Sequence, residues 1–284
     1  MNDYELLANG LLIGADSPYQ ITSMDGLLTT PDLQRSDKAK LQRHGVFSSN
    51  RYYGKRTVTV TIQITETATI SFDRAISDLK SALRFDQDEQ AFSLQFPGVA
   101  NGEPIRFNGT VDKVSLPQSR DFYYGIPEAT IQIVCSDPRL YSDVLATDSL
   151  NLPIDTGGVT FAVEFNMEFS DLEASQSTIV LMNSGDFDAP VRFAVNGEIS
   201  NPTIIHEESG RQLVLDGYSQ TANDFLLINS ADKSVLLNGT ASRRQLLTSE
   251  SSFFDLQPGT NTIRFDGVGD GTAILTASYR SAYI

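Results

Sequence analysis

Residues 57–65 alternate strictly between apolar and polar side chains and give the clearest strand pattern in the chain. The β-branched residues at every second position from Val58 to Ile64 fall on one face, and threonines and Gln63 fall on the other. A period of two residues predicts a strand with one buried face. Weaker forms of this pattern predict further strands at residues 11–13, 19–22, 91–96, 104–108, 109–116 and 129–135.

One segment has the period of an amphipathic helix instead. Between Phe72 and Leu83 the apolar residues recur at spacings of three and four, which places them on one stripe of an α-helix. Ser71 suits the N-cap position, and Asp73 and Lys80 lie at the ends that the helix dipole favours. The pattern predicts a single helix over about residues 71–85, with its apolar stripe in the core.

The second half of the chain, from residue 183 to 265, is a series of short apolar runs separated by turn residues. The run 191–195 alternates like the first strand, and Asn-Gly or Asp-Gly dipeptides mark tight turns at 196–197, 216–217 and 238–239. Turns at intervals of roughly eight to twelve residues are typical of an antiparallel sandwich. The chain as a whole is therefore predicted to be mainly β.

A length of 284 residues favours two domains over a single core. The polar stretch 142–155 separates the two strand-rich halves, and we place the domain boundary in it, between residues 150 and 151. The charge balance also shifts there, since residues 1–150 carry 14 basic and 19 acidic groups and residues 151–284 carry 7 and 17. We predict an N-terminal β domain with the one helix over 1–150 and a β-sandwich over 151–284.

Residues 29–56 form a long polar segment with little periodicity. Seven of the chain's 21 basic residues fall within 22 positions of it, from Arg35 to Arg56. Such a segment is either a solvated loop or an arm that reaches an acidic neighbour, because loops this long inside compact domains are usually functional or disordered. The residues alone leave both interpretations open.

The formal net charge of −15 argues against nucleic-acid binding, since a polyanion would be repelled. No apolar run approaches the roughly 18 residues that span a bilayer. Asp3 and Glu5 stand where a secretory signal carries positive charge, so export by that route is not expected. Cys135 is the single cysteine, which fits assembly in a reducing cytoplasm, and we expect it to be a small buried hydrophobe.

The sequence lacks a P-loop, a Gly-x-Ser-x-Gly elbow, a His-Glu-x-x-His pair and a Gly-x-Gly-x-x-Gly fingerprint. The two histidines, His44 and His206, are interpreted as structural. Acidic pairs such as Asp186 and Asp188 lack the spacing of an EF-hand loop and are interpreted as solvated turns. We therefore predict neither an enzyme nor a cofactor or metal site.

A carbohydrate-binding sandwich, used for adhesion to a host surface, is the alternative function. Sugar platforms usually present an aromatic face, and the chain has no tryptophan, the best stacking residue. Phe253, Phe254 and Tyr218 are the aromatic residues that could substitute, although alternation places at least one of the two phenylalanines in the core.

Several motifs, in one order along the chain, resemble those of the distal tail proteins of siphophages. In the C-terminal half they are Val-Asn-Gly-Glu-Ile-Ser-Asn-Pro at 195–202, Leu-Val-Leu-Asp at 213–216 and Leu-Gln-Pro-Gly-Thr-Asn-Thr-Ile-Arg-Phe at 256–265. In the N-terminal half they are His-Gly at 44–45, Tyr-Gly-Lys-Arg at 53–56, the single helix and Ser-Asp-Pro-Arg-Leu-Tyr at 136–141. The likeness covers nearly the whole chain, although the end, 277–284, is not diagnostic.

This resemblance implies a structural hub protein. Its N-terminal domain, a β-sandwich with one helix and a belt-like arm at about 29–56, would form a homo-hexameric ring, and its C-terminal domain would be a galectin-like sandwich. The ring would lie at the distal end of the virion tail and join the tail tube protein to the tail-tip hub protein and to receptor-binding proteins. DNA would pass through its opening without specific binding.

A head-to-tail ring needs two different, complementary patches on each subunit. The basic segment offers one patch, and the acidic remainder of the chain offers the other. We predict that Arg43, His44, Arg51, Lys55 and Arg56 lie at the subunit interface.

Overall fold

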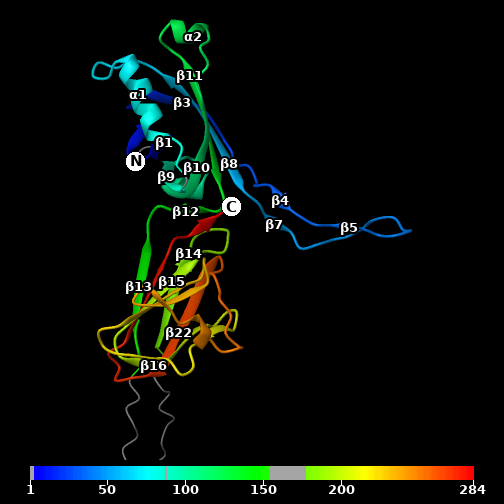
Figure 1. Cartoon of the computed structure of the whole chain (residues 1–284), viewed down its shortest axis with the longest axis vertical. Coiled ribbons are helices and arrows are strands. Elements are labelled where there is room, and N and C mark those ends of the chain that lie inside the picture. The colour runs from blue at the N-terminus through cyan, green and yellow to red at the C-terminus, as the bar shows by residue number, and fades with distance from the viewer. Residues whose placement is uncertain (1–2, 87, 154–176) are drawn as a thin grey trace, which may run out of the picture. The chain divides into compact units, whose positions relative to one another are not determined.

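The computed structural model describes residues 3–86, 88–153 and 177–284 (Figure 1). The chain divides into an N-terminal unit, residues 1–144 with 283–284, and a C-terminal unit, residues 145–282. Antiparallel sheets dominate both units, which confirms the predicted fold class.

Apart from the short strands within residues 33–53, the strands of the N-terminal unit pair in one continuous order, in which a single long strand belongs to two sheets. β10 (Ile105–Ser115) pairs with β9 (Gln90–Gln95) through its first half and with β11 (Glu128–Cys135) through its second. The full order is β2 (Leu11–Ile13), β1 (Glu5–Ala8), β9, β10, β11, β8 (Arg56–Ile64) and β3 (Tyr19–Asp25), with β12 (Leu140–Ser142) beside β10.

The core of this unit follows the alternation seen in the sequence. The four β-branched residues from Val58 to Ile64 are fully buried, and the helix α1 (Phe72–Ala82) packs Ala75 and Leu79 into the same core. The hydroxyl of Tyr19 donates to the Ala75 carbonyl at 2.7 Å and so ties β3 to the helix. Cys135 is buried as expected, and burial raises the pKa of its thiol to about 12.

The helix prediction needs two adjustments. α1 begins after Ser71, as expected, but ends at Ala82, three residues short of the predicted end. A second helix, α2 (Arg120–Tyr123), lies in the connection between β10 and β11. It has only four residues and none of them is buried, so the sequence shows no helical period there. A short 3-10 turn covers Ala100–Gly102.

The described part of the C-terminal unit, residues 145–153 and 177–282, contains two sheets. The six-stranded sheet has the order β13 (Ala146–Asn151), β23 (Ile274–Tyr279), β15 (Val191–Asn196), β19 (Phe225–Asn229), β20 (Ser234–Leu237) and β21 (Ala241–Ser242). The other has the order β14 (Ser177–Asn183), β22 (Gly259–Val268), β16 (Ile199–His206) and β17 (Arg211–Val214), with β18 (Ser219–Gln220) beside β16. A 3-10 turn covers Arg244–Leu246. The last strand, β24 (Ala282–Tyr283), pairs with β12. The apolar face predicted for 191–195 is buried.

The unit boundary falls before β13, earlier than the one placed from the sequence. β13 pairs with β23 over its full length, from Ala146 opposite Tyr279 to Asn151 opposite Ile274. A boundary between residues 150 and 151 would therefore separate most of an edge strand from its sheet.

This pairing leads to a prediction for two fragments. A fragment of residues 145–284 should be more stable than one of residues 151–284 by about 1–3 kcal/mol, because cross-strand pairs contribute a few tenths of a kcal/mol or more each. Urea unfolding followed by circular dichroism measures the difference. Equal stabilities would mean that β13 adds nothing to the C-terminal unit.

Candidate subunit interface: the projecting arm

Residues 28–55, here called the arm, leave the N-terminal unit between β3 and β8 as a two-stranded ribbon (Figure 1). Two short antiparallel ladders hold it together: β4 (Leu33–Gln34) with β7 (Tyr52–Tyr53), and β5 (Lys38–Ala39) with β6 (Val46–Phe47). The segment predicted as a belt-like loop is thus partly β-structure. Each ladder strand has two residues, too few for a period to show in the sequence.

Polar side chains fasten the ribbon between its ladders. Asp37 accepts the backbone N–H of Ser49 at 2.9 Å, and the Ser49 hydroxyl accepts the N–H of Ser36 at 2.8 Å. The bond from the Ser49 N–H, with smaller contributions from the Ser49 hydroxyl and from Arg35 and Arg51, lowers the pKa of the Asp37 carboxyl below its usual range. The arm therefore has a defined conformation along its middle.

Arg56 anchors the root of the arm. Its side chain is 2% exposed, and its Nη1 lies 2.6 Å from the Gly26 carbonyl and 2.9 Å from the Leu27 carbonyl, with Thr29 at 3.2 Å. Its Nε donates to the Pro138 carbonyl at 2.7 Å. One guanidinium thus joins the outgoing strand of the arm to β8 and to the turn after β11.

A glycine completes this root. Gly26 has φ of +92°, and a Cβ there would lie 2.0 Å from the Thr57 carbonyl oxygen. Any side chain at this position would separate the two strands where the arm begins.

The surface of the arm combines exposed apolar and basic side chains. Leu41 is 91% exposed and Phe47 is 64% exposed, with the Lys40 ammonium 5.4 Å from the centre of the Phe47 ring. The arm carries six basic residues against two acidic ones, within a chain of net charge −15. Four more large apolar residues are exposed on it: Leu28, Leu33, Val46 and Tyr52. Exposed apolar area of this kind typically marks an interaction site.

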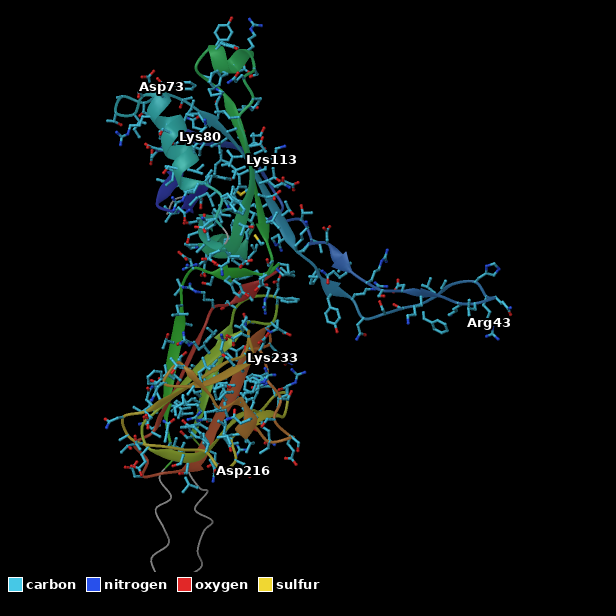
Figure 2. All side chains as sticks on the ribbon, viewed as in Figure 1. Arg43, Asp73, Lys80, Lys113, Asp216 and Lys233 are labelled. Atoms are coloured by element: carbon cyan, nitrogen blue, oxygen red, sulfur yellow. The ribbon has the colours of Figure 1, made fainter. Side chains whose placement is uncertain are left out.

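Four of the five predicted interface residues are exposed on this arm. Arg43 and His44 lie in the loop between β5 and β6, and Figure 2 shows Arg43 at the far end of the ribbon. Arg51 and Lys55 lie on the returning strand. The fifth, Arg56, is buried within its own unit, where it anchors the root of the arm.

Sequence reasoning missed the apolar part of this surface. Without a period, Leu41 and Phe47 could not be distinguished from core residues. A signal for Arg56 did exist, since it occupies the same alternating positions as Val58 and Val60, which places it on the buried face of β8.

The aromatic residues considered for sugar binding do not form an exposed platform. Phe254 is buried, with its ring 5.8 Å from that of Phe193 and 5.2 Å from that of His206. Tyr218 is buried and donates to Gln220 at 2.7 Å. Phe253 is half-buried beneath the Arg244 guanidinium. A sugar ring would find no open aromatic face at these three positions.

His206 has a structural environment. Its ring is fully buried, with Nδ1 2.6 Å from the Ser209 hydroxyl and Nε2 2.9 Å from the Asn261 side-chain oxygen. Within residues 3–86, 88–153 and 177–284, no three His, Cys, Asp or Glu side chains gather as metal ligands would. Nor is any helix of those ranges long and apolar enough to cross a membrane.

Comparisons with known proteins find similarity to phage tail components. Residues 184–283 match the family described as siphovirus-type tail component, C-terminal domain. None of the curated proteins matches the sequence.

The crystal structure of the Dit protein (gp 19.1) of phage SPP1 matches the whole of both chains with a TM-score of 0.67 at 10% identity. That protein is described as a paradigm of the hub adsorption apparatus in phages that infect Gram-positive bacteria. The phage P2 baseplate, in its activated conformation with Ca, matches 98% of both chains with a TM-score of 0.51 at 9% identity. Residues 184–283 are therefore similar to the C-terminal domain of siphovirus-type tail components, and the resemblance of the chain to the distal tail protein family is confirmed.

Proposed function

We propose that this chain is the structural hub subunit of a siphophage tail tip and that it assembles through the arm into a homo-hexameric ring. The arm carries the proposal, because it exposes apolar and basic side chains that contribute nothing to the core of its own unit. The family match in the C-terminal unit supports the coarser role of a tail component. The likeness of fold to SPP1 Dit supports the same role.

A cyclic ring suits a subunit with two unlike surfaces. In a head-to-tail contact the arm of one subunit covers a different patch on the next, and the rotation closes after a fixed number of copies. The basic arm would lie on acidic surface, which the chain offers in excess. Six copies of net charge −15 sum to −90, so this local pairing and the burial of residues such as Leu41 and Phe47 must offset long-range repulsion.

The two units would divide the work of the hub. The N-terminal unit would form the ring between the tail tube protein and the tail-tip hub protein at the distal end of the virion tail. The C-terminal unit, which we propose to be galectin-like, would project outward as a platform for receptor-binding proteins. DNA would pass through the opening unbound, because an acidic lumen repels phosphate.

The oligomeric state of the purified full chain tests this function. We expect native mass spectrometry to give six copies and negative-stain images to show rings, with interfaces near the ordinary size of about 1,600 Å². A chain that stays monomeric at micromolar concentration, alone and with its tail tube and hub proteins, would overturn the proposal.

A further inference from the structure

The outer face of the N-terminal sheet consists mainly of hydroxyl and amide side chains. On β8, Thr59 and Thr61 lie on the side opposite the core, and on β11 Thr130 and Gln132 lie beside them in register. Over β3, β8, β11 and residues 110–115, Lys113 is the single exposed cation. Figure 2 shows it on the sheet, apart from Lys80 on α1 and Arg43 on the arm.

A β-bulge brings Lys113 onto this face. Val111 pairs with Ile133, but Lys113 pairs with Gln132, so Asp112 is an extra residue in β10. With regular alternation Lys113 would follow Val111 into the core, whereas the extra residue turns Lys113 and Ser115 outward. Bulges commonly re-aim side chains next to functional sites.

The re-aimed residues border a hollow of about 320 Å³. Thr59, Lys113, Ser115, Thr130 and Gln132 line it. The lining supplies an ammonium, three hydroxyls and a carboxamide, all able to donate hydrogen bonds, and it contains no carboxylate.

Among residues 3–86, 88–153 and 177–284, the ammonium of Lys113 has no ion-pair partner. Asp25 is a carboxylate in the same row of the sheet, on β3 opposite Thr59 of β8. It lies three strands away from Lys113, which corresponds to about 14 Å. Its carboxylate already accepts the Gly26 N–H at 2.8 Å and the Thr29 hydroxyl at 3.1 Å.

We propose that this hollow is an oxyanion site that binds an aspartate or glutamate side chain from a second copy of the chain. One ammonium with neutral donors matches the single charge of a carboxylate. A DNA backbone fits poorly, because its phosphates would approach a protein of net charge −15. A second copy supplies carboxylates in excess, since the chain has 36 acidic and 21 basic residues.

The position of the hollow favours the same occupant. β3 and β8, which lie on this face, lead directly into and out of the arm. A second copy that engages the root of the arm comes close to the hollow. The inference therefore rests on the proposed ring and adds a second contact to it.

Carbodiimide coupling of the full chain tests this contact, because the reagent joins a lysine amine to a touching carboxylate without a spacer. An equal mixture of ¹⁴N- and ¹⁵N-labelled protein distinguishes cross-links between copies from those within one. We expect Lys113 to give mixed-isotope cross-links to Asp or Glu and the exposed Lys80 and Lys233 to give none. We also expect Lys113→Gln to weaken ring assembly about tenfold and Lys80→Gln to leave it unchanged.

The outcomes separate this inference from the ring itself. Rings in which Lys113 forms no cross-link between copies would overturn the site and leave the ring standing. A chain that remains monomeric would overturn both. Binding of a short DNA duplex that Lys113→Gln abolishes would assign the hollow to phosphate and overturn the carboxylate.

Discussion

Replacing Arg56 with methionine is expected to lower the free energy of unfolding of the N-terminal unit by about 3–5 kcal/mol, the range for breaking a buried charged contact. Methionine nearly matches the aliphatic part of the side chain but donates no hydrogen bond. The carbonyls of Gly26, Leu27 and Pro138 would then lose their partner at the root of the arm. A lost partner for a buried polar group costs about 1–3 kcal/mol.

Differential scanning calorimetry of the full chain measures this effect, since each unit gives its own contribution to the melting curve. The melting temperature of the N-terminal unit should fall by roughly 10 °C, while the melting temperature of the C-terminal unit should not change. Lys55→Met is the matched control, because it removes an exposed charge from the adjacent position. Similar small shifts for both variants would show that the guanidinium does not anchor the arm.

Arg56→Lys refines the test. Lysine keeps the charge but lacks the planar fork, and it cannot hold carbonyls on two sides in the same geometry. We expect the stability of Arg56→Lys to lie between that of the wild type and that of Arg56→Met. A full loss would mean that the fork geometry, rather than the charge, holds the arm.

The elements that the sequence predicted best are those whose burial repeats with a regular period. The alternation from Val58 to Ile64 and the stripe from Phe72 to Leu83 record which face meets the core. Every residue on the buried face must be apolar, so the spacing of a few apolar positions distinguishes a strand from a helix.

Features that depend on contacts distant in sequence could not be predicted in this way. Arg56 and Lys55 are adjacent bases, yet one is buried and the other exposed, because the carbonyls that bind Arg56 come from residues 26–29 and from Pro138. The bulge at Asp112 likewise shows only in the pairing of β10 with β11. The first feature holds the root of the arm, and the second determines the face on which Lys113 lies.

Reversing the charges of Arg43, Arg51 and Lys55 to glutamate is expected to leave a folded monomer. All three side chains are exposed, so the core of the N-terminal unit should keep its melting temperature. Facing an acidic neighbour, the new carboxylates would replace attraction with repulsion, and like charges in contact cost several kcal/mol. Ring dissociation should therefore become at least about 100-fold more favourable.

The matched control carries the same change in net charge elsewhere. Lys80, Arg84 and Lys233 are exposed outside the arm, and their reversal to glutamate takes the chain from −15 to −21, as the arm variant does. Native mass spectrometry compares the variants at two salt concentrations. Salt weakens the repulsion between distant exposed charges more than it weakens the interaction of charges buried in an interface. If both variants dissociate equally and salt restores both, the arm is a solvated loop and net charge alone governs assembly. Loss of rings in the arm variant alone means that the contact is local, because only the position of the three charges differs between the two proteins.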